Sequence, residues 1–412
     1  MTDELRFPEQ FWWGVAGAAH QIEGGNSNSD CWLLEHTPGS PYPEPSGDAC
    51  DHYHRYPTDI ALIAALGFNT YRFSIEWARI EPEEGEFSIA ALEHYRRMLV
   101  TCHEYGLKPI VTYHHFTSPR WFAAKGGWER MENGDLFVRY AERATRHLGD
   151  LIGAVCTFNE PNVGLLGQYG GWVPSDDVIR AAPWRAAAAR AVGSDTFAAF
   201  PNCAQEPARD TFIATHRKAY DAIKSGPGDF PVGLTLALND QQAVPGGEAM
   251  RDRVRAAVDD VFLESVRGDD FVGVQTYTRA RYDANGQMGP EEGVELTLMG
   301  YEFYPEALEG TIRHAAKVSG CPVIVTENGI GADDDTSRIK YVRRALRGVN
   351  NCLEDGVDVR GYCYWSIFDN FEWTLGYRPT FGLIAVDRET QRRTLKPSAS
   401  WLGRIAQTGV LE

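Results

Sequence analysis

Short apolar and β-branched runs recur along the chain, and several of them end in polar side chains. Runs of this kind, bounded by turn-forming residues, predict buried strands. Eight such runs occur, in chain order FWWGVAGAA, FNTYRFSI, LKPIVTYHH, AVCTFNEP, PVGLTLAL, FVGVQTY, PVIVTENG and VRGYCYWSI. Two of them, AVCTFNEP and PVIVTENG, carry a glutamate near their C-terminal end. The presence of a carboxylate at the end of a buried strand calls for an explanation.

Helical patterns lie between several of these runs. Residues 58–66 and 89–105 predict helices before the second and third strands, and Gly67 and Gly106 follow them where a C-terminal glycine belongs. In the longer helix, the residues that fall near one face are Leu92, Tyr95, Arg96, Leu99 and Cys102. The chain therefore alternates between strand and helix.

Eight strands alternating with helices predict a (β/α)8 TIM barrel, an α/β fold whose bare form takes about 250 residues. We expect a single domain over residues 1–412 with insertions over the C-terminal face, and residues 172–210 as an insertion at the barrel mouth. A doubly wound sheet is the alternative architecture. It needs a glycine-rich phosphate loop after an early strand, and the sequence has neither a GxGxxG nor a GxxxxGK motif.

Composition and charge narrow the class of function. Hydrophobic residues make up 43% of the chain and charged residues 24%, which is typical of a soluble globular protein. The formal net charge of −17 argues against a nucleic-acid partner. No apolar run approaches the roughly 18 residues that a membrane helix needs, so we expect no membrane partner.

The start of the chain and its cysteines indicate the compartment. The stretch MTDELRFPEQFWWG lacks the cationic and apolar regions of a secretory signal. The eight cysteines include no CxxC pair, and we expect reduced, mostly buried thiols rather than disulfides. These features predict a cytoplasmic protein.

Polar and aromatic residues gather at the predicted strand ends, which converge on one face of a (β/α)8 barrel. Carboxylates and amides can bind sugar hydroxyls, and indole rings can stack on the apolar face of a pyranose. The set therefore suits a carbohydrate. Its members are Gln21, Glu23, Arg72, His114, His115, Asn159, Glu160, Tyr277, Glu327, Trp365, Glu372 and Trp373.

Two glutamates at strand ends suggest paired-carboxylate chemistry. One carboxyl, protonated, donates to the departing glycosidic oxygen, while the other, ionised, attacks the anomeric carbon. An arginine such as Arg72 keeps a nearby carboxylate ionised, whereas burial raises the pKa of a carboxyl. These arguments alone leave open whether Glu160 or Glu327 is the acid.

Other polar residues have a simpler interpretation. His52 and His54 have a spacing seen in metal sites, but no carboxylate or cysteine cluster completes one, so we expect structural roles. Glu23 is interpreted as structural and paired with a basic neighbour. His114 is interpreted as a core or supporting histidine beside His115.

Six stretches in the correct order resemble glycoside hydrolase family 1, the β-glucosidase family of retaining (β/α)8 barrels. They are FWWGVAGAAHQIEG, DHYHRYPTDIALIAALGFNTYRFSIEWARIEP, FNEP, VTENG, GYCYWSIFDNFEW and FGLIAVD. NEP or TENG alone would be modest evidence. Six motifs in order, from residue 7 to about residue 402, are very specific.

The resemblance implies a role for each candidate. Glu160 of the NEP motif would be the general acid/base and Glu327 of the TENG motif the nucleophile. Arg72 and Tyr277 would flank Glu327 and hold it charged and correctly aimed. The residues implied to hold the glycone hydroxyls are Gln21, His115, Asn159, Glu372 and Trp373, with Trp365 as the stacking floor.

The resemblance also bears on the substrate. The chain keeps the pair Glu372-Trp373, and its TLGYRPTFG stretch has no lysine, which favours a neutral sugar over a 6-phosphosugar. HFTSP places Phe116 where tryptophan is common in the family, which could loosen one wall of the sugar pocket. Small-molecule β-glycosides or short oligosaccharides are the expected substrates, with no metal and no cofactor.

Three functional hypotheses follow. The first is a retaining β-glycosidase that hydrolyses terminal β-D-glucosyl residues, with galactosides or fucosides also tolerated. The second is a transglycosidase that uses the same site and passes the sugar to an alcohol or sugar acceptor. The third is a non-catalytic sugar-binding descendant of the fold. Such proteins typically lose one catalytic glutamate, and this chain has both.

Overall fold

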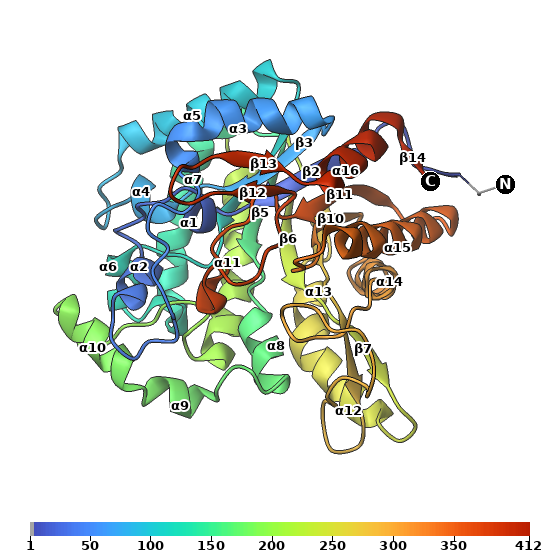
Figure 1. Ribbon diagram of the computed structural model, residues 1–412. Coiled ribbons are helices and arrows are strands. Elements are labelled where there is room, and N and C mark those ends of the chain that lie inside the picture. Colours follow the sequence, from blue (N-terminus) through green and yellow to red (C-terminus); the bar gives the residue numbers. More distant parts are fainter. Residues whose placement is uncertain (1–3) are drawn as a thin grey trace.

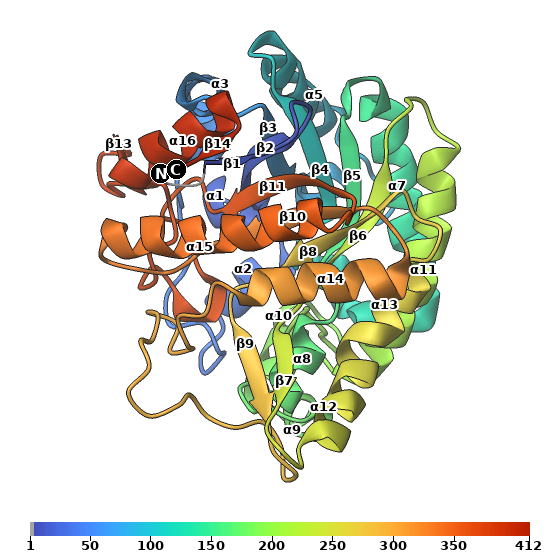
Figure 2. The same ribbon diagram turned by 90° about the vertical axis from the view of Figure 1, so that its right-hand side faces the viewer.

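The computed structural model describes residues 4–412. Residues 1–3, which belong to the predicted 1–412 domain and to the N-terminal stretch examined for a signal, lie outside the described residues. Within the described residues, eight parallel strands close into a barrel in the order β10-β11-β2-β3-β4-β5-β6-β8 (Figures 1 and 2). The (β/α)8 prediction is confirmed.

Each of the eight predicted apolar runs contains one barrel strand. The strands are β2 (Trp12–Gly17), β3 (Thr70–Ser74), β4 (Lys108–His114), β5 (Ala154–Asn159), β6 (Val232–Ala237), β8 (Phe271–Gln275), β10 (Val323–Asn328) and β11 (Val359–Trp365). Every residue of β5 and β10 is buried. Parallel strands that are covered on both faces have continuous apolar sequences, and this is why the apolar runs predicted the strands.

Helices surround the barrel (Figure 2). The long ones are α3 (His52–Leu66), α5 (Ile89–Glu104), α7 (Gly134–Leu148), α11 (Gln205–Lys224), α14 (Ala307–Ser319), α15 (Asp335–Glu354) and α16 (Pro397–Thr408). The shorter α-helices are α1 (Ala19–Ile22), α2 (Asp30–Glu35), α4 (Trp77–Ile80), α6 (Arg120–Ala124), α8 (Val163–Tyr169), α9 (Asp176–Arg180), α10 (Pro183–Ala191), α12 (Glu248–Arg255) and α13 (Val261–Ser265). A π-helical turn, Ala256–Asp260, joins α12 to α13.

Small two-stranded sheets and 3-10 turns complete the fold. The sheets pair β1 (Leu5–Arg6) with β14 (Val410–Leu411), β7 (Asp240–Ala243) with β9 (Arg279–Tyr282), and β12 (Ile384–Val386) with β13 (Arg393–Leu395). The 3-10 turns are Gly127–Glu129, Met131–Asn133, Gly149–Leu151 and Trp373–Leu375. Because β1 pairs with β14, residues 5–6 and 410–411 lie side by side.

The helix α5 follows the sequence prediction closely. Its N-cap Ser88 accepts a hydrogen bond from the backbone N–H of Ala91. On the predicted face Leu92, Tyr95, Leu99 and Cys102 are buried. Arg96 lies at the edge of that face and donates to the carboxylate of Asp150.

The prediction for α3 was wrong at its N-terminus, because the helix begins at His52 rather than at residue 58. Pro57 lies inside it, where its ring removes one backbone donor. Proline therefore leaves one backbone hydrogen bond of the helix unmade, and hydrogen bonds of the His52 side chain stabilise the first turn. The buried His52 ring bonds to Asp59 through Nδ1 at 2.8 Å and to the hydroxyl of Tyr71 through Nε2 at 3.2 Å. His52 is therefore structural.

The segment 172–210 contains α9, α10 and the first residues of α11, which begins at Gln205. Together with α8 it connects β5 to α11, and α8 to α10 lie together below the barrel in Figure 1. Trp172 is 61% exposed, while Phe197 and Phe200 are buried. The segment thus has its own ordered helices and apolar contacts.

Two further expectations concern thiols and membranes. All eight cysteines lie within residues 4–412, where they are buried free thiols. In the part of the chain that the structure describes, no helix has both the length and the apolar character to cross a membrane.

Replacing Gly233 with alanine tests how tightly the barrel strands pack. A Cβ atom there would lie 2.2 Å from the carbonyl oxygen of Phe271 on the neighbouring strand. We expect Gly233→Ala to lower the free energy of unfolding by about 1–3 kcal/mol, measured as a lower urea midpoint. Gly289→Ala is the control, because Gly289 is exposed and its Cβ would meet nothing within 4 Å. Equal midpoints for the two variants would contradict the described packing.

Candidate active site

The predicted site residues lie on or just after the barrel strands. Arg72 is in β3, Asn159 ends β5, and Glu160 follows it. The remaining positions are Gln21 in α1 after β2, His115 after β4, Tyr277 after β8, Glu327 near the end of β10, Trp365 at the end of β11, and Glu372 and Trp373 beyond it. The carboxyl ends of parallel barrel strands share one rim. Hydrogen bonds and ring contacts show which of these residues the fold brings together.

Both glutamates follow a local irregularity in strand pairing. The register of β10 against β8 shifts between Val325 and Glu327, and that of β5 against β6 shifts between Cys156 and Asn159. Such irregularities re-aim the side chains that follow them. Glu160 also has a backbone φ of 46°, which is uncommon for a residue with a side chain. The backbone thus departs from regular strand geometry next to both Glu160 and Glu327.

Glu327 is held by two donors. Arg72 Nη1 donates to its Oε1 at 2.5 Å, and the hydroxyl of Tyr277 donates to its Oε2 at 2.6 Å. Burial raises the pKa of Glu327, and the charge of Arg72 and the hydrogen bonds from Tyr277 and Arg72 oppose that rise. The carboxylate is therefore fixed in position and its ionised form is favoured by its partners.

Glu160 has a different environment. Within residues 4–412 it has no hydrogen bond to its carboxyl that would favour the charged form, and it is 8% exposed. Burial raises its pKa well above the ordinary value, and repulsion from Glu327 and Glu372 adds to the rise, while Arg72 partly offsets it. The protonated form of Glu160 is favoured beside an ionised Glu327.

Arg72 also orients the amide of Asn159. Its Nη2 donates to Asn159 Oδ1 at 2.5 Å, and Gln275 Nε2 donates to the same oxygen at 2.9 Å. With its oxygen taken by two donors, the amide presents Nδ2, which has no hydrogen-bond partner among the described residues. Gln275 is not among the predicted site residues, and its contact with Asn159 gives it a positioning role.

A second polar group connects Gln21 with the end of β11. Gln21 Nε2 donates to the carbonyl of Phe371 at 2.6 Å, and Trp365 Nε1 donates to Glu372 Oε1 at 3.3 Å. Oriented so that both its amide atoms find partners, Asn370 accepts from Gln21 and donates to Glu372. The sequence prediction missed Asn370, although the DN of the FDNFEW motif was its available signal. Burial raises the pKa of Glu372 well above its ordinary value, and the bond from Trp365 opposes this.

Aromatic rings line the same region. The ring of His115 stacks on Trp365 at 5.8 Å and on Trp373 at 6.2 Å between centroids. Phe116 contacts Trp373 at 5.0 Å. Burial and the nearby charge of Arg72 hold the pKa of His115 well below its usual range, so its ring is neutral. The site combines flat apolar surfaces with buried hydrogen-bonding groups, as a pyranose requires.

Residues interpreted as structural have structural partners. Glu23 is paired with Arg79 at 2.9 Å and accepts from the hydroxyl of Tyr95. His114 accepts a hydrogen bond from the indole of Trp128 at 3.2 Å and is surrounded by aromatic rings. Both predictions are consistent with these contacts, since neither side chain bonds to Glu160 or Glu327.

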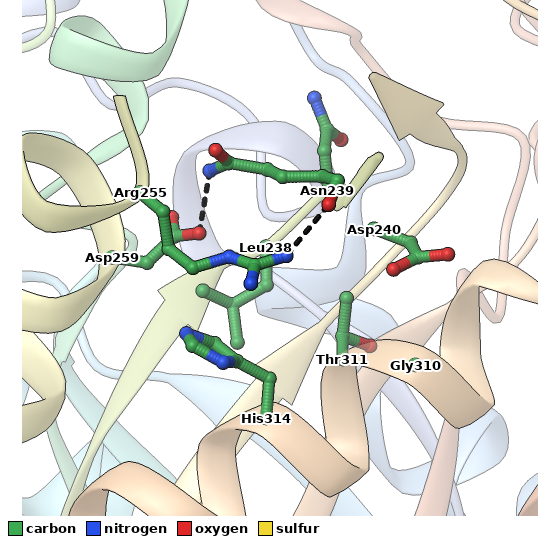
Figure 3. Close-up of a pocket in the computed structure, with 9 residues that line it drawn as sticks. Leu238, Asn239, Asp240, Arg255, Asp259, Gly310, Thr311 and His314 are labelled. Atoms are coloured by element: carbon green, nitrogen blue, oxygen red, sulfur yellow. Dashed lines mark hydrogen bonds between the residues drawn. The ribbon is translucent and has the colours of Figure 1, made fainter. Parts of the chain in front are cut away.

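Two hollows lie away from this set of residues. A cavity of about 10 Å³, with room for one water molecule, lies between β7, the π-helical turn and α14, and is lined by Gln241, Arg255, Asp259 and His314 among others (Figure 3). A larger hollow of about 180 Å³ lies between α8 and α11, beside Tyr169 and Arg209. Neither is lined by a predicted site residue, so the polar contacts, not these hollows, locate the candidate site.

One group of side chains has the composition of a metal site. Among residues 4–412, only His20, Cys31 and Glu35 bring three ligand atoms within 4.8 Å of one another. All three are buried and are hydrogen-bonded to one another or to close neighbours. Hydrogen bonding accounts for the cluster without an ion.

Comparisons with known proteins decide the family. The sequence model of glycosyl hydrolase family 1 matches residues 3–266 and 264–410, which is nearly the whole chain. The chain belongs to glycosyl hydrolase family 1. This confirms the resemblance seen in the motifs, and the chain is an O-glycosyl hydrolase that works with retention.

Individual relatives agree with this assignment. The chain is 30% identical to β-glucosidase A of Acetivibrio thermocellus over 98% of both chains. It is 30% identical to a bifunctional β-D-glucosidase/β-D-fucosidase of Bifidobacterium breve, over 97% of this chain and 98% of that protein. A crystal structure of a β-glycosidase superimposes with a TM-score of 0.94 at 55% identity, covering 97% of each chain.

Proposed function

We propose that this family 1 enzyme hydrolyses terminal, non-reducing β-D-glucosyl residues, with Glu327 as the nucleophile and Glu160 as the general acid/base. The observation that carries the proposal is the contrast between the two carboxyls. Glu327 accepts hydrogen bonds from Arg72 and Tyr277, which favour its charge. Glu160 is buried without such donors and next to other carboxylates, which favours its protonated form.

The reaction follows from these protonation states. An oxygen of Glu327 attacks the anomeric carbon while Glu160 donates its proton to the departing glycosidic oxygen, so the C–O bond breaks and a glycosyl ester forms. Water then enters, Glu160 takes a proton from it, and the hydroxyl attacks the same carbon. The ester bond breaks, the sugar leaves with its original anomeric configuration, and both glutamates return to their starting states.

The glycone is held by the polar groups around the two glutamates. We assign this role to Gln21, His115, Asn159, Glu372 and Trp373, with Trp365 as the floor. Gln21 Oε1, His115 Nδ1 and Asn159 Nδ2 are buried polar atoms that have no hydrogen-bond partner in residues 4–412. Sugar hydroxyls would supply those partners, and buried polar groups are nearly always paired.

We also propose a substrate class, a cellular compartment and domain boundaries for this enzyme. Relatives named β-glucosidase and β-D-glucosidase/β-D-fucosidase support small-molecule β-glycosides as substrates, with glucosides first and fucosides or galactosides as further candidates. The absence of CxxC pairs and the buried thiols support a reducing, cytoplasmic compartment. We also propose that residues 1–412 form one domain and that residues 172–210 are an insertion at the barrel mouth.

Leaving-group dependence tests the two catalytic roles. Glu327→Gln should remove turnover of every aryl β-D-glucoside, because the covalent step is lost. Glu160→Ala should slow substrates with poor leaving groups far more than those with good ones, because only the former need a proton. Added azide should restore its turnover and yield a β-glycosyl azide. A loss in Glu160→Ala that is equal for all leaving groups would contradict the assignment.

The pH profile tests the electrostatics. kcat/KM should rise with pH as Glu327 loses its proton and fall as Glu160 loses its own, giving a bell. Tyr277→Phe removes a hydrogen bond that lowers the pKa of Glu327, so the acidic limb should move to higher pH. Tyr140→Phe is the control, because the buried Tyr140 hydroxyl donates to the carbonyl of Tyr113. An unmoved acidic limb in Tyr277→Phe would contradict the described environment.

A further inference from the structure

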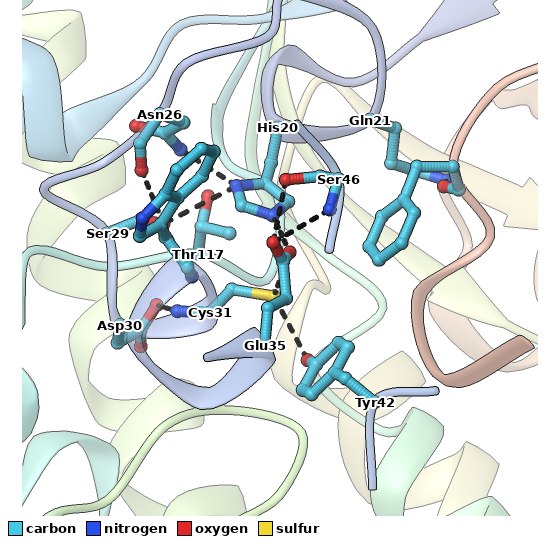
Figure 4. A network of polar contacts seen from close by, with 12 residues as sticks. His20, Gln21, Asn26, Ser29, Asp30, Cys31, Glu35, Tyr42, Ser46 and Thr117 are labelled. Atoms are coloured by element: carbon cyan, nitrogen blue, oxygen red, sulfur yellow. Dashed lines mark hydrogen bonds and ion pairs between the residues drawn. The ribbon is translucent and has the colours of Figure 1, made fainter. Parts of the chain in front are cut away.

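A buried polar network packs against the proposed sugar site. It consists of His20 from α1, Cys31 and Glu35 from α2, Tyr42 and Ser46 from the loop after α2, and Asn26 before it (Figure 4). Every one of these side chains is buried. None of them belongs to the catalytic pair or to the residues that we assign to the glycone.

The ring of His20 is fixed at both nitrogens. Asn26 Nδ2 donates to Nδ1 at 2.9 Å, which leaves the ring proton on Nε2. Nε2 then donates to Glu35 Oε1 at 2.6 Å. With both nitrogens partnered, the imidazole can neither rotate nor exchange its proton position without losing a buried hydrogen bond.

Glu35 is in turn anchored on its other oxygen. Oε2 accepts from the backbone N–H of Ser46 at 2.9 Å and from the hydroxyl of Ser46 at 2.8 Å. Burial raises the pKa of Glu35, but the hydrogen bonds from His20 and Ser46 outweigh it and leave the pKa below its usual value. Glu35 is therefore a fixed negative charge behind the imidazole.

The fixed imidazole lies flat against Trp373. The two ring planes differ by 7° and their centroids are 5.6 Å apart. Trp373 stands in a 3-10 turn with a backbone φ of 52°, so its main chain is in the sparsely populated left-handed region. Its indole is placed by ring contacts with His20, His115 and Phe116. Among these three rings, His20 is the one stacked closest to parallel.

We infer that the His20–Glu35 pair is a positioning device that sets the plane of the Trp373 indole and thereby the fit of the glycone. The inference rests on the proposed function, because it assigns Trp373 to the sugar. His20 does not touch the reacting atoms and acts through Trp373. Sites that must be held within about half an ångström need such locked supporting side chains.

Double-mutant kinetics test whether His20 affects the glycone site through Trp373. His20→Ala should lower kcat/KM for an aryl β-D-glucoside by about tenfold or more, as misplaced binding groups do. In a Trp373→Ala background the same change should cost less than about twofold, because the side chain through which it acts is gone. The same fold loss in both backgrounds would overturn the inference.

A matched control separates positioning from folding. His216 forms another fully buried histidine pair, bonding to Asp269 at 2.7 Å and to Thr157 at 2.8 Å, and its aromatic neighbour is Tyr220. His216→Ala should lower the Tm as His20→Ala does, yet change kcat/KM of the folded enzyme by less than about twofold. A loss of kcat/KM in His216→Ala that equals the loss in His20→Ala would also overturn the inference.

An activity-independent readout keeps this test separate from the proposed function. The protein is labelled with 5-fluorotryptophan, and the ¹⁹F resonance of Trp373 is assigned by its loss in Trp373→Phe. Glu35→Gln replaces one of the carboxylate oxygens that bond to His20 and Ser46 with an amide nitrogen and leaves Trp373 itself unchanged, so it should shift or broaden this resonance. An unmoved resonance would overturn the inference. If the wild type instead hydrolysed no β-glycoside while Glu35→Gln moved the resonance, the proposed function would fail and the positioning of Trp373 would stand.

Discussion

The ion pair between Arg72 and Glu327 is the contact on which the site depends. It joins β3 to β10, two barrel strands that are not neighbours, across 255 positions of sequence. Burying both charges is costly unless each finds further hydrogen bonds. Tyr277 supplies one for Glu327, and Asn159 supplies one for Arg72. One guanidinium thus holds Glu327, orients the amide of Asn159 beside Glu160, and links three strands of the barrel.

The different protonation states favoured at Glu160 and Glu327 follow from the contact between Arg72 and Glu327. Since Arg72 and Tyr277 favour a charged Glu327, the neighbouring Glu160 is repelled in its charged form and desolvated without compensating donors. The same electrostatic arrangement thus favours an ionised Glu327, the proposed nucleophile, and a protonated Glu160, the proposed acid. Around them lie the stacked rings and amide contacts that we propose to hold the glycone, and the His20–Glu35 pair packs against Trp373 in that group.

The sequence predicted the eight strands well because parallel strands covered on both faces are necessarily apolar runs. It also placed Glu160 and Glu327 at strand ends, and six motifs identified the family. Other features depend on geometry that no local pattern encodes. Examples are the start of α3 ahead of Pro57, where His52 bonds to Asp59 in the same helix and to Tyr71 in β3, and the contacts of Asn370. The flat stacking of His20 on Trp373 likewise joins segments far apart in the chain.

The proposed nucleophile is tested most directly by trapping the covalent bond between Glu327 and the sugar. Incubation with a 2-deoxy-2-fluoro-β-D-glucoside carrying a good leaving group slows breakdown of the ester, and peptide mass spectrometry then locates the label. We expect one fluoroglucosyl group per chain, on the peptide that contains Glu327, with loss of activity in proportion to labelling. A label on Glu160 or Glu372, or full turnover without any labelled peptide, would contradict the proposal.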